Sequence, residues 1–416
     1  MNRAEAKQKA QALVAQMDVL EAAAQLSYDA PALDRLHIPE YNWWNEALHG
    51  VARAGVATSF PQAIAMAASF DQDEVQHLGE IASTEGRAKY NALSQKGDRD
   101  IYKGLTFWSP NINIFRDPRW GRGHETYGED PYLTTQLGLS YIRGLQGQGE
   151  YLKAAACAKH FAVHSGPEAE RHHFDVHPSK KDMAETYLPA FEAAVKEGHV
   201  ESVMGAYNAV NGYPCCGSPE LLQNYLRDNW GFEGHVVSDC WAIRDFHENH
   251  HFTDTPAESS AAALKAGTDL NCGCTYRCLL TALAQKLISE ADIRQAAVRL
   301  FTTRYLLGIM DGQHTEFDNI PYSKVECKAH TDYAIQAAEK GIVLLKNNGI
   351  LPLCKENLTS IGVIGPNANS RAALIGNYYG TSSRYITVLE GIQDEVGDDV
   401  RVYYSQGCHL FKDRVQ

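Results

Sequence analysis

The sequence GHVVSDCWAI, residues 234–243, predicts a short buried β-strand that ends on a carboxylate. Val236 and Val237 form the apolar run, and Asp239 follows at the point where the backbone would leave the core. A carboxylate in such a place costs free energy unless hydrogen bonds or nearby charges compensate for it. Capping of the next helix or turn would account for one aspartate of this kind, so its meaning depends on whether the pattern recurs.

Two upstream segments repeat this pattern of a small apolar run with polar residues at its end. AAACAKHFAV (154–163) leads into Lys159 and His160, and ESVMGAYNAV (201–210) leads into Tyr207. Neighbouring residues of a strand point to opposite faces. Lys159 and His160 can therefore both face a substrate only where the strand has ended or carries a bulge. Otherwise the pair is a buried, hydrogen-bonded histidine beside a surface lysine.

Amphipathic helices are expected between these strands, at DMAETYLPAFEAAVKEG (182–198) and SPELLQNYLRDNW (218–230). Strands that alternate with helices form a parallel sheet with crossover connections. Polar residues at the carboxyl ends of its strands are typical of the active face of a barrel. We therefore predict an α/β fold with a (β/α)8 TIM-like barrel, in which Lys159, Tyr207 and Asp239 converge.

The length of the chain, 416 residues, favours two structural units. LISEADIRQAAVRLFTTRYLLGIM (287–310) has a strong helical pattern with Ser289 as its N-cap, and it is the expected closing helix of the first unit. We expect a TIM-like catalytic barrel over 1–312, a linker and first helix over 313–340, and a partial α/β sandwich domain over 341–416.

The last region is expected to begin with a helix at DYAIQAAEKG (332–341), followed by strands at GIVLLKN (341–347) and TSIGVIGPNA (359–368). It stops at Gln416, which is early for a domain that holds a parallel sheet. We therefore expect the chain to be truncated at its carboxyl end.

Composition narrows the class of protein. A formal net charge of −13 argues against a nucleic-acid or polybasic membrane partner, and no apolar run approaches the roughly 18 residues of a membrane span. Residues 1–26 are charged and amphipathic, which predicts a helix rather than a secretory signal. The ten cysteines are scattered, so we expect mostly free thiols in a reducing cytoplasm. The sequence neither requires nor excludes a homo-oligomer.

Metal and cofactor sites are not expected. The loop VHSGPEAERHHFDVH (163–177) is rich in histidine and carboxylates but has no HExxH or other fixed ligand spacing. A polar loop over a sugar site, with Arg171 among the substrate-binding residues, fits better. Cys272, Cys274 and Cys278 form a CxCxxxC pattern that matches no usual iron–sulfur or zinc spacing, so they are interpreted as packing residues.

Two further segments carry candidate ligand-binding groups. RDPRWGRGHETYGEDP (116–131) resembles neither a P-loop nor a dinucleotide fingerprint, and its arginines are expected to pair with carboxylates and to contact ligand hydroxyls. WWNEALHG (43–50) places Glu46 beside two tryptophans, which suits a sugar ring. A buried aromatic cluster is the alternative for Trp43 or Trp44 individually.

Taken together, the segments resemble glycoside hydrolase family 3. The resemblance spans nearly the whole chain and rests on WNEALHG, RDPRWGRGHETYGEDP, AKHF, MGAYNAVNG, GFEGHVVSD, AGTDLN, GIVLLKN, IGVIGPNA and GNYYG. It implies a retaining, exo-acting β-glycosidase that forms a covalent glycosyl-enzyme and needs no cofactor. By this resemblance Asp239 is the nucleophile. The residues implied to hold the sugar are Arg122, Lys159, His160 and Tyr207, with Glu46 on its distal hydroxyls.

Two departures from the family's glucosidases bear on the substrate. Those enzymes usually carry Asp at the position of Glu46 and Trp at the position of Cys240. The combination found here resembles the family's β-xylosidase branch. A longer carboxylate would crowd a C6 hydroxymethyl group, which xylose lacks. We therefore favour β-xylosides, as xylo-oligosaccharides or aryl glycosides, over β-glucosides.

The general acid/base is the third departure. In the family it is usually a Glu in the sandwich domain, and no matching motif occurs up to Gln416. A retaining glycosidase needs two carboxylates about 5–5.5 Å apart, and this chain is expected to supply one. A catalytically impaired sugar-binding fragment is one alternative. Another is the family's N-acetylglucosaminidase branch, which uses a loop His with an Asp; here the loop offers His172, His173 and Asp175, in a different pattern.

Overall fold

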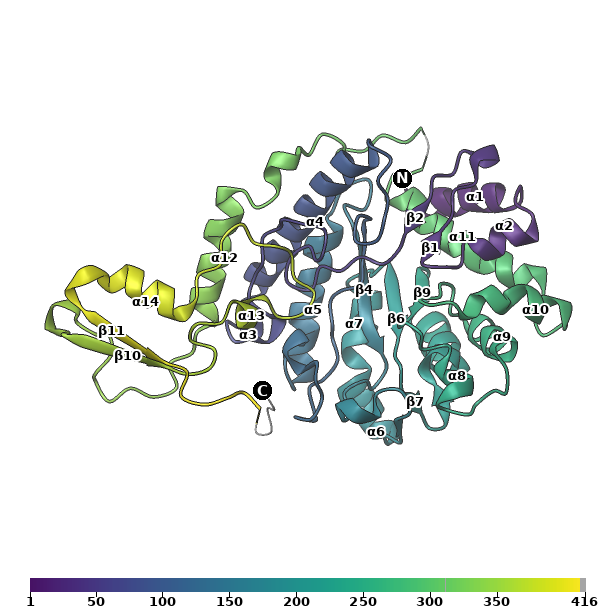
Figure 1. Cartoon of the computed structure of the whole chain (residues 1–416). Helices are drawn as coiled ribbons and strands as arrows, with labels where there is room; N and C mark the ends of the chain where they lie inside the picture. The colour runs from purple at the N-terminus through teal and green to yellow at the C-terminus, as the bar shows by residue number, and fades with distance from the viewer. Residues whose placement is uncertain (311, 412–416) are drawn as a thin grey trace.

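The computed structural model describes residues 1–310 and 312–411 and is built on a parallel sheet in the order β3-β4-β6-β9 (Figure 1). Its strands are β3 (Thr106–Phe107), β4 (Ala155–Phe161), β6 (Ser202–Gly205) and β9 (His235–Ser238). Isolated parallel bridges Asn45↔Phe107 and Val237↔Leu270 extend the pairing at both edges. The α/β class and the parallel sheet are thereby confirmed. Closure into an eight-stranded barrel stays a prediction.

The sheet is buried on both faces, which explains its unbroken runs of small apolar residues. In β4, Ala156 and Ala158 belong to one hydrophobic core, whereas Ala155 and Cys157 belong to the other. Around these cores lie α1 (Arg3–Val14), α2 (Val19–Ala24), α3 (Ala63–Ala67), α4 (Gln72–Ser94), α5 (Pro131–Gln146), α6 (Lys180–Asp182), α7 (Pro189–Lys196), α8 (Asp245–Glu248), α9 (Pro256–Ala266), α10 (Leu279–Ala284) and α11 (Glu290–Leu306). Short strands β1 (Asp29–Ala30), β2 (Tyr41–Asn42), β5 (Asp175–Val176), β7 (Ala209–Val210) and β8 (Tyr213–Pro214) form small accessory sheets.

The helices predicted at 182–198, 218–230 and 287–310 are confirmed, whereas residues 1–26 form two helices, α1 and α2, instead of one. The segment 182–198 forms a π-helical turn, Met183–Tyr187, followed by α7. The segment 218–230 forms a π-helix over Glu220–Asn229. Ser289 caps α11 in a capping box with Asp292, which satisfies backbone donors at both positions.

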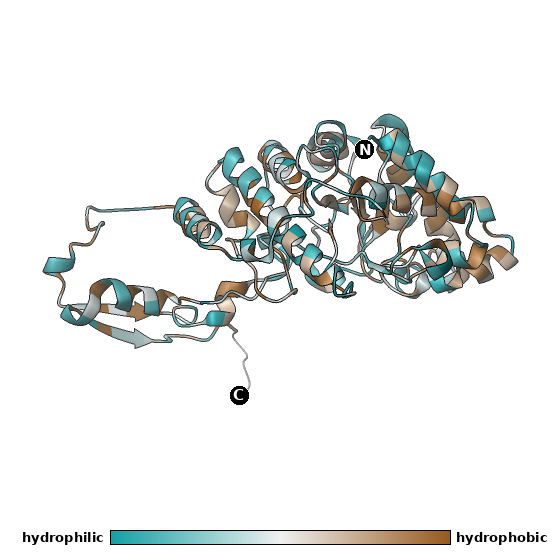
Figure 2. Cartoon of the chain, turned by 90° about the horizontal axis from the view of Figure 1, so that it is seen from above, coloured by the Kyte–Doolittle hydropathy of each residue, from teal (hydrophilic) through white to brown (hydrophobic). Residues whose placement is uncertain are grey.

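The second region extends to one side of the first in both views (Figures 1 and 2). It contains α12 (Lys328–Gly341), the parallel pair β10 (Ser360–Ile364) and β11 (Arg401–Ser405), and helices α13 (Arg371–Ile375) and α14 (Val388–Val396). The prediction of a strand at 341–347 is wrong: these residues pair with no described strand, and Leu345 is 92% exposed. A strand needs a partner ladder for its backbone groups, and β10 takes β11 as its partner.

One cysteine expectation needs correction. Cys240 and Cys272 form a disulfide across a sequence separation of 32, so Cys272 is more than a packing thiol. The parallel bridge Val237↔Leu270 brings together the two turns that follow it, which contain Cys240 and Cys272. The Cα atoms of these two cysteines lie 4.4 Å apart. The other eight cysteines are free thiols. Within the described residues, no helix has the length and apolar character needed to cross a bilayer.

Candidate active site

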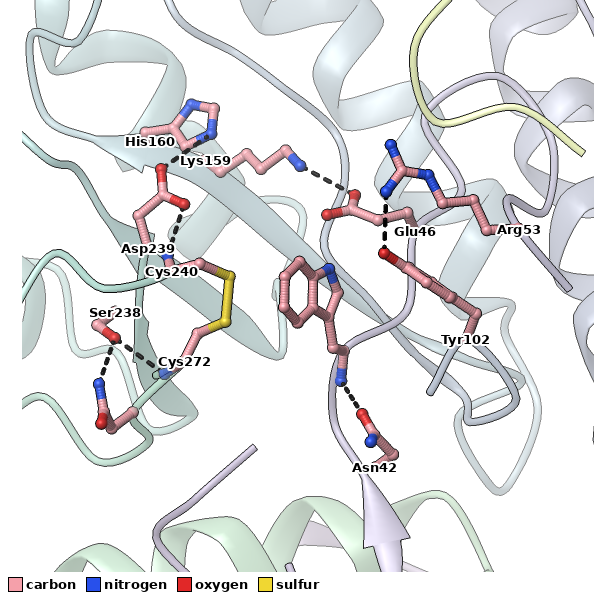
Figure 3. The surroundings of a disulfide bond; sticks show 12 residues. Asn42, Glu46, Arg53, Tyr102, Lys159, His160, Ser238, Asp239, Cys240 and Cys272 are labelled. Carbon is pink, nitrogen blue, oxygen red and sulfur yellow. Dashed lines mark hydrogen bonds and ion pairs between the residues drawn. A yellow bond between two sulfur atoms is a disulfide. The ribbon is translucent and has the colours of Figure 1, made fainter. Parts of the chain in front are cut away.

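Lys159 and His160 both face the site because the register of β4 against β6 shifts between Lys159 and Phe161. This irregularity removes the strict alternation of side chains at the end of the strand. Lys159 Nζ donates to Glu46 Oε2 at 3.0 Å, and His160 Nε2 lies 3.6 Å from Asp239 Oδ2 (Figure 3). The bulged-strand alternative is therefore the one found.

Asp239 follows directly after β9 and is 6% exposed. The backbone N–H of Cys240 donates to its Oδ1 at 2.8 Å, whereas Oδ2 is buried with no hydrogen-bond partner among the described residues. Burial raises the pKa of Asp239, and the positive charges of Arg122 and Lys159 oppose that rise. One carboxylate oxygen is thus held by the backbone and the other is free.

His160 is neutral, because burial among positive charges lowers its pKa well below the ordinary value. Its Nδ1 lies 2.9 Å from Asn113 Oδ1, and Asn113 Nδ2 donates to the carbonyl of His160. This network makes Nδ1 the donor and leaves a lone pair on Nε2. Two acceptors, His160 Nε2 and Asp239 Oδ2, therefore face the same space, which suits a hydroxyl donor.

Glu46 and Lys159 form an ion pair that is almost fully removed from solvent. Burial raises the pKa of Glu46 to about 7, although Lys159 and Arg122 act in the opposite direction. Such a pair is stable only while both partners are present, since removing one leaves an uncompensated buried charge.

Arg122 is fixed by Glu125, a residue that sequence reasoning missed. Arg122 Nε and Nη2 donate to the two oxygens of Glu125 at 2.9 and 2.7 Å. Burial alone would raise the pKa of Glu125, but Arg122 and Lys159 outweigh it and lower that pKa to about 2. Asn111 and Asn377 add donors to the same carboxylate. The i,i+3 spacing of Arg122 and Glu125 was the available signal.

Tyr207 follows shortly after β6, so Lys159, Tyr207 and Asp239 stand at the carboxyl ends of three different strands. Burial and then Asp239 raise the pKa of Tyr207, and Arg122 and Arg171 lower it. Tyr207 makes no hydrogen bond to Asp239: Oδ1 accepts from the Cys240 amide, and Oδ2 has no donor among the described residues.

Arg171 lies at the rim of the site. Its guanidinium carbon is 5.9 Å from the centre of the Tyr207 ring, and its side chain pairs with Glu168. The adjacent His172 packs edge-on against Tyr207 and places Nδ1 2.8 Å from Asp245 Oδ2.

Asp175 does not pair with His172. It lies 3.3 Å from His177 instead and accepts a hydrogen bond from the Gly212 amide. Asp175 thus forms no dyad with His172. Within the described residues, no group of three or more His, Cys, Asp and Glu side chains is arranged to hold a metal ion.

The two tryptophans of WWNEALHG differ in role. Trp43 is buried and packs edge-on against Tyr41, so the core alternative applies to it. Trp44 stacks on Trp108 and contacts Trp241, a half-exposed ring two residues after Asp239. Aromatic surface therefore borders the nucleophile candidate.

The second region also contributes to the site. Asn377 Nδ2 donates to Glu125 Oε1 at 3.1 Å, and the Tyr378 ring lies over the Lys159 ammonium. Both residues belong to GNYYG, which the sequence marked as a motif without indicating what it contacts.

Two family models match the chain. Residues 12–304 match the Glycosyl hydrolase family 3 N terminal domain, and residues 342–412 match the C-terminal domain of the same family. The chain belongs to glycosyl hydrolase family 3.

Among the similar proteins are enzymes named as xylosidases and as glucosidases. The chain is 44% identical to the xylan 1,4-beta-xylosidase of Xylanibacter ruminicola, over 99% of this chain and 48% of that protein. A solved GH3 exo-beta-xylosidase (XlnD) in complex with a xylobiose aziridine probe superimposes with a TM-score of 0.91 at 37% identity, covering 97% of this chain and 53% of that one. The beta-glucosidase of Listeria innocua in complex with glucose gives 0.82 at 26% identity, covering 98% and 61%. The chain spans about half the length of the curated relatives it matches.

Proposed function

We propose that this chain carries the sugar-binding site and the nucleophile of a retaining, exo-acting β-xylosidase that acts on terminal β-D-xylosides. The observation that carries the proposal is Asp239: one oxygen is fixed by the Cys240 amide, and the other is free beside His160. The oligosaccharide or aryl glycoside would present its anomeric carbon to Oδ2.

The proposed chemistry begins with attack of Asp239 Oδ2 on the anomeric carbon. A C–O bond to the enzyme forms as the bond to the leaving group breaks, and water later releases the sugar from the ester. Arg122 and Lys159 supply positive charge that favours the ionised, nucleophilic form of Asp239.

Sugar hydroxyls would be held by the remaining groups. His160 Nε2 can accept from one hydroxyl beside the attacking oxygen, while Glu46 and Lys159 can accept from and donate to others. We assign Tyr207 and Arg171 to the rim of the same subsite. Each role follows the family resemblance and is compatible with the observed positions.

Two residues, Glu46 and Cys240, support the proposed preference for xylosides over glucosides. Glu46 has a longer side chain than the aspartate that the family's glucosidases usually carry. Cys240, with its disulfide to Cys272, stands where those enzymes usually carry a tryptophan. The relatives named as xylosidases are more similar to this chain than the Listeria glucosidase. A β-glucosidase is the second candidate, and that structural neighbour favours it.

We propose that the acid/base lies outside residues 1–416. Among the other carboxylates at the site, Glu46 and Glu125 are each committed to a buried cation. By itself the chain would then be a catalytically impaired sugar-binding unit. An N-acetylglucosaminidase is disfavoured, because His172 pairs with Asp245 and not with Asp175.

The domain division is likewise a proposal: a TIM-like barrel closed by α11 over 1–312, a linker with α12 over 313–340, and part of a sandwich domain over 341–416. It is supported by the parallel sheet of the first region and the separate β10–β11 pair.

The test is covalent labelling with 2,4-dinitrophenyl 2-deoxy-2-fluoro-β-xyloside, whose leaving group needs no acid. Peptide mass spectrometry should find one fluoroxylosyl group, on Asp239. Asp239→Asn should abolish labelling, because an amide cannot form the ester, whereas the matched Asp117→Asn variant should label normally. A label on another carboxylate would refute the assignment.

A further inference from the structure

The motif GNYYG, residues 376–380, brings the second region into the sugar site. Gly376 has φ +62°, a conformation that favours glycine. A Cβ at Gly380 would lie 2.6 Å from the carbonyl oxygen of Val51. The two glycines therefore allow the segment to lie directly against the loop that follows Glu46.

Backbone hydrogen bonds fix this segment on its carboxyl side. The N–H of Arg53 donates to the carbonyl of Tyr379 at 2.9 Å. Thr381 donates to Gly55 at 3.0 Å and accepts from Ala57 at 3.1 Å. The segment is attached like a short parallel strand.

The amino side of the segment is fixed as well. Asn377 Nδ2 donates to Glu125 Oε1 at 3.1 Å. The backbone carbonyl oxygen of Asn377 lies 2.8 Å from His49 Nε2. Tyr378 is therefore held from both directions and behaves as a fixed wall of the site.

The Tyr378 ring faces a buried cation. Its centre lies 4.8 Å from Lys159 Nζ and 5.8 Å from the guanidinium carbon of Arg122. Lys159 is 1% exposed, and Glu46 is the one hydrogen-bonded partner of its ammonium group among the described residues. A cation over an aromatic face is attracted by the negative charge of that face, most strongly when water is excluded.

We propose that Tyr378 is a positioning residue: its ring holds the Lys159 ammonium against Glu46, so that the second region completes the sugar subsite of the first. This rests on the proposed function. The π face, and not the phenolic hydroxyl, is the active part. Docking of the segment 376–381 is thus a condition for tight binding of the sugar.

The first measurement is the dissociation constant of xylose for the whole chain, by isothermal titration calorimetry. Tyr378→Leu, which removes the π face, should weaken binding about 2- to 30-fold. Tyr378→Phe should bind within about twofold of the unsubstituted chain, and so should the matched control Tyr379→Leu. A Phe variant as weak as the Leu variant would overturn the proposal, since the hydroxyl would then be responsible.

The second measurement does not depend on sugar. Brief treatment with acetic anhydride, followed by peptide mass spectrometry, gives the modification rate of Lys159. The rate should rise in Tyr378→Leu and stay unchanged in Tyr378→Phe and Tyr379→Leu. Equal rates in all four proteins would refute the contact. Faster modification in Tyr378→Leu alone, without xylose binding by any protein, would support the positioning role and contradict the proposed function.

Discussion

Replacing Glu125 by glutamine tests whether the Glu125 carboxylate stabilises the buried Arg122 guanidinium. Glu125→Gln keeps the shape of the side chain but leaves Arg122 without its carboxylate, and the loss of one partner of a buried pair costs about 3–5 kcal/mol. The pKa of Glu125 leads to a similar figure. It falls from the ordinary 4.5 to about 2, and 1.36 kcal/mol for each unit corresponds to about 3 kcal/mol.

The sign of the pH dependence follows from the lowered pKa. A carboxylate of this kind contributes its full stabilisation above its unfolded pKa of 4.5 and loses it as the pH falls through about 2. The difference between the two proteins should therefore be largest near pH 7 and should narrow below pH 4.5.

Urea unfolding followed by fluorescence measures this difference. At pH 7 the variant should lose about 3–5 kcal/mol, and the gap should shrink steadily from pH 4.5 to pH 3. Glu129→Gln, an exposed change in the same segment, should stay within about 0.5 kcal/mol. A loss below about 1 kcal/mol, or one that does not change with pH, would show that Glu125 does not stabilise Arg122 as an ion pair.

Three further predictions concern the sugar site. Xylose affinity should rise as the pH increases through about 7, because Glu46 then ionises, and Glu46→Gln should flatten that profile in calorimetry. In a longer form that supplies the acid/base, Glu46→Asp should shift the ratio of kcat/KM towards aryl glucosides by about ten- to two-hundredfold; an unchanged ratio would exclude Glu46 as the boundary of the site. The chain as given should hydrolyse xylobiose hardly at all, because the leaving alcohol needs an acid. It should slowly release dinitrophenol from dinitrophenyl β-xyloside, and azide should speed this release because azide needs no general base. Vigorous xylobiose hydrolysis would place the acid/base within residues 1–416.

Much of the site could be predicted because its residues lie at the carboxyl ends of strands, and a short apolar run followed by polar residues marks such an end in the sequence. The apolar run before Asp239 fixes where β9 ends, and the carboxyl ends of parallel strands meet at one edge of a sheet. The Lys159–His160 pair was harder, because alternation predicts opposite faces and only the bulge reconciles them.

What the sequence did not predict depends on contacts between distant segments. The Cys240–Cys272 bond requires knowing that two turns are neighbours, and spacing alone does not reveal this. Tyr378 lies far along the chain from Lys159, and its side chain type does not indicate a cation beneath it. The strand expected at 341–347 was misjudged because an apolar run predicts burial without naming a partner.

The bulge at the end of β4 has a consequence for protein engineering. Upstream of it, Ala155, Ala156, Cys157 and Ala158 alternate between two packed cores, so a single-residue deletion there would exchange the two sets and disrupt both. At Lys159 and His160 the register shift interrupts the alternation of side chains, so these two consecutive residues can both point into the site. Saturation libraries aimed at new specificities should therefore vary position 159 only together with its partner Glu46, and should leave residues 155–158 untouched.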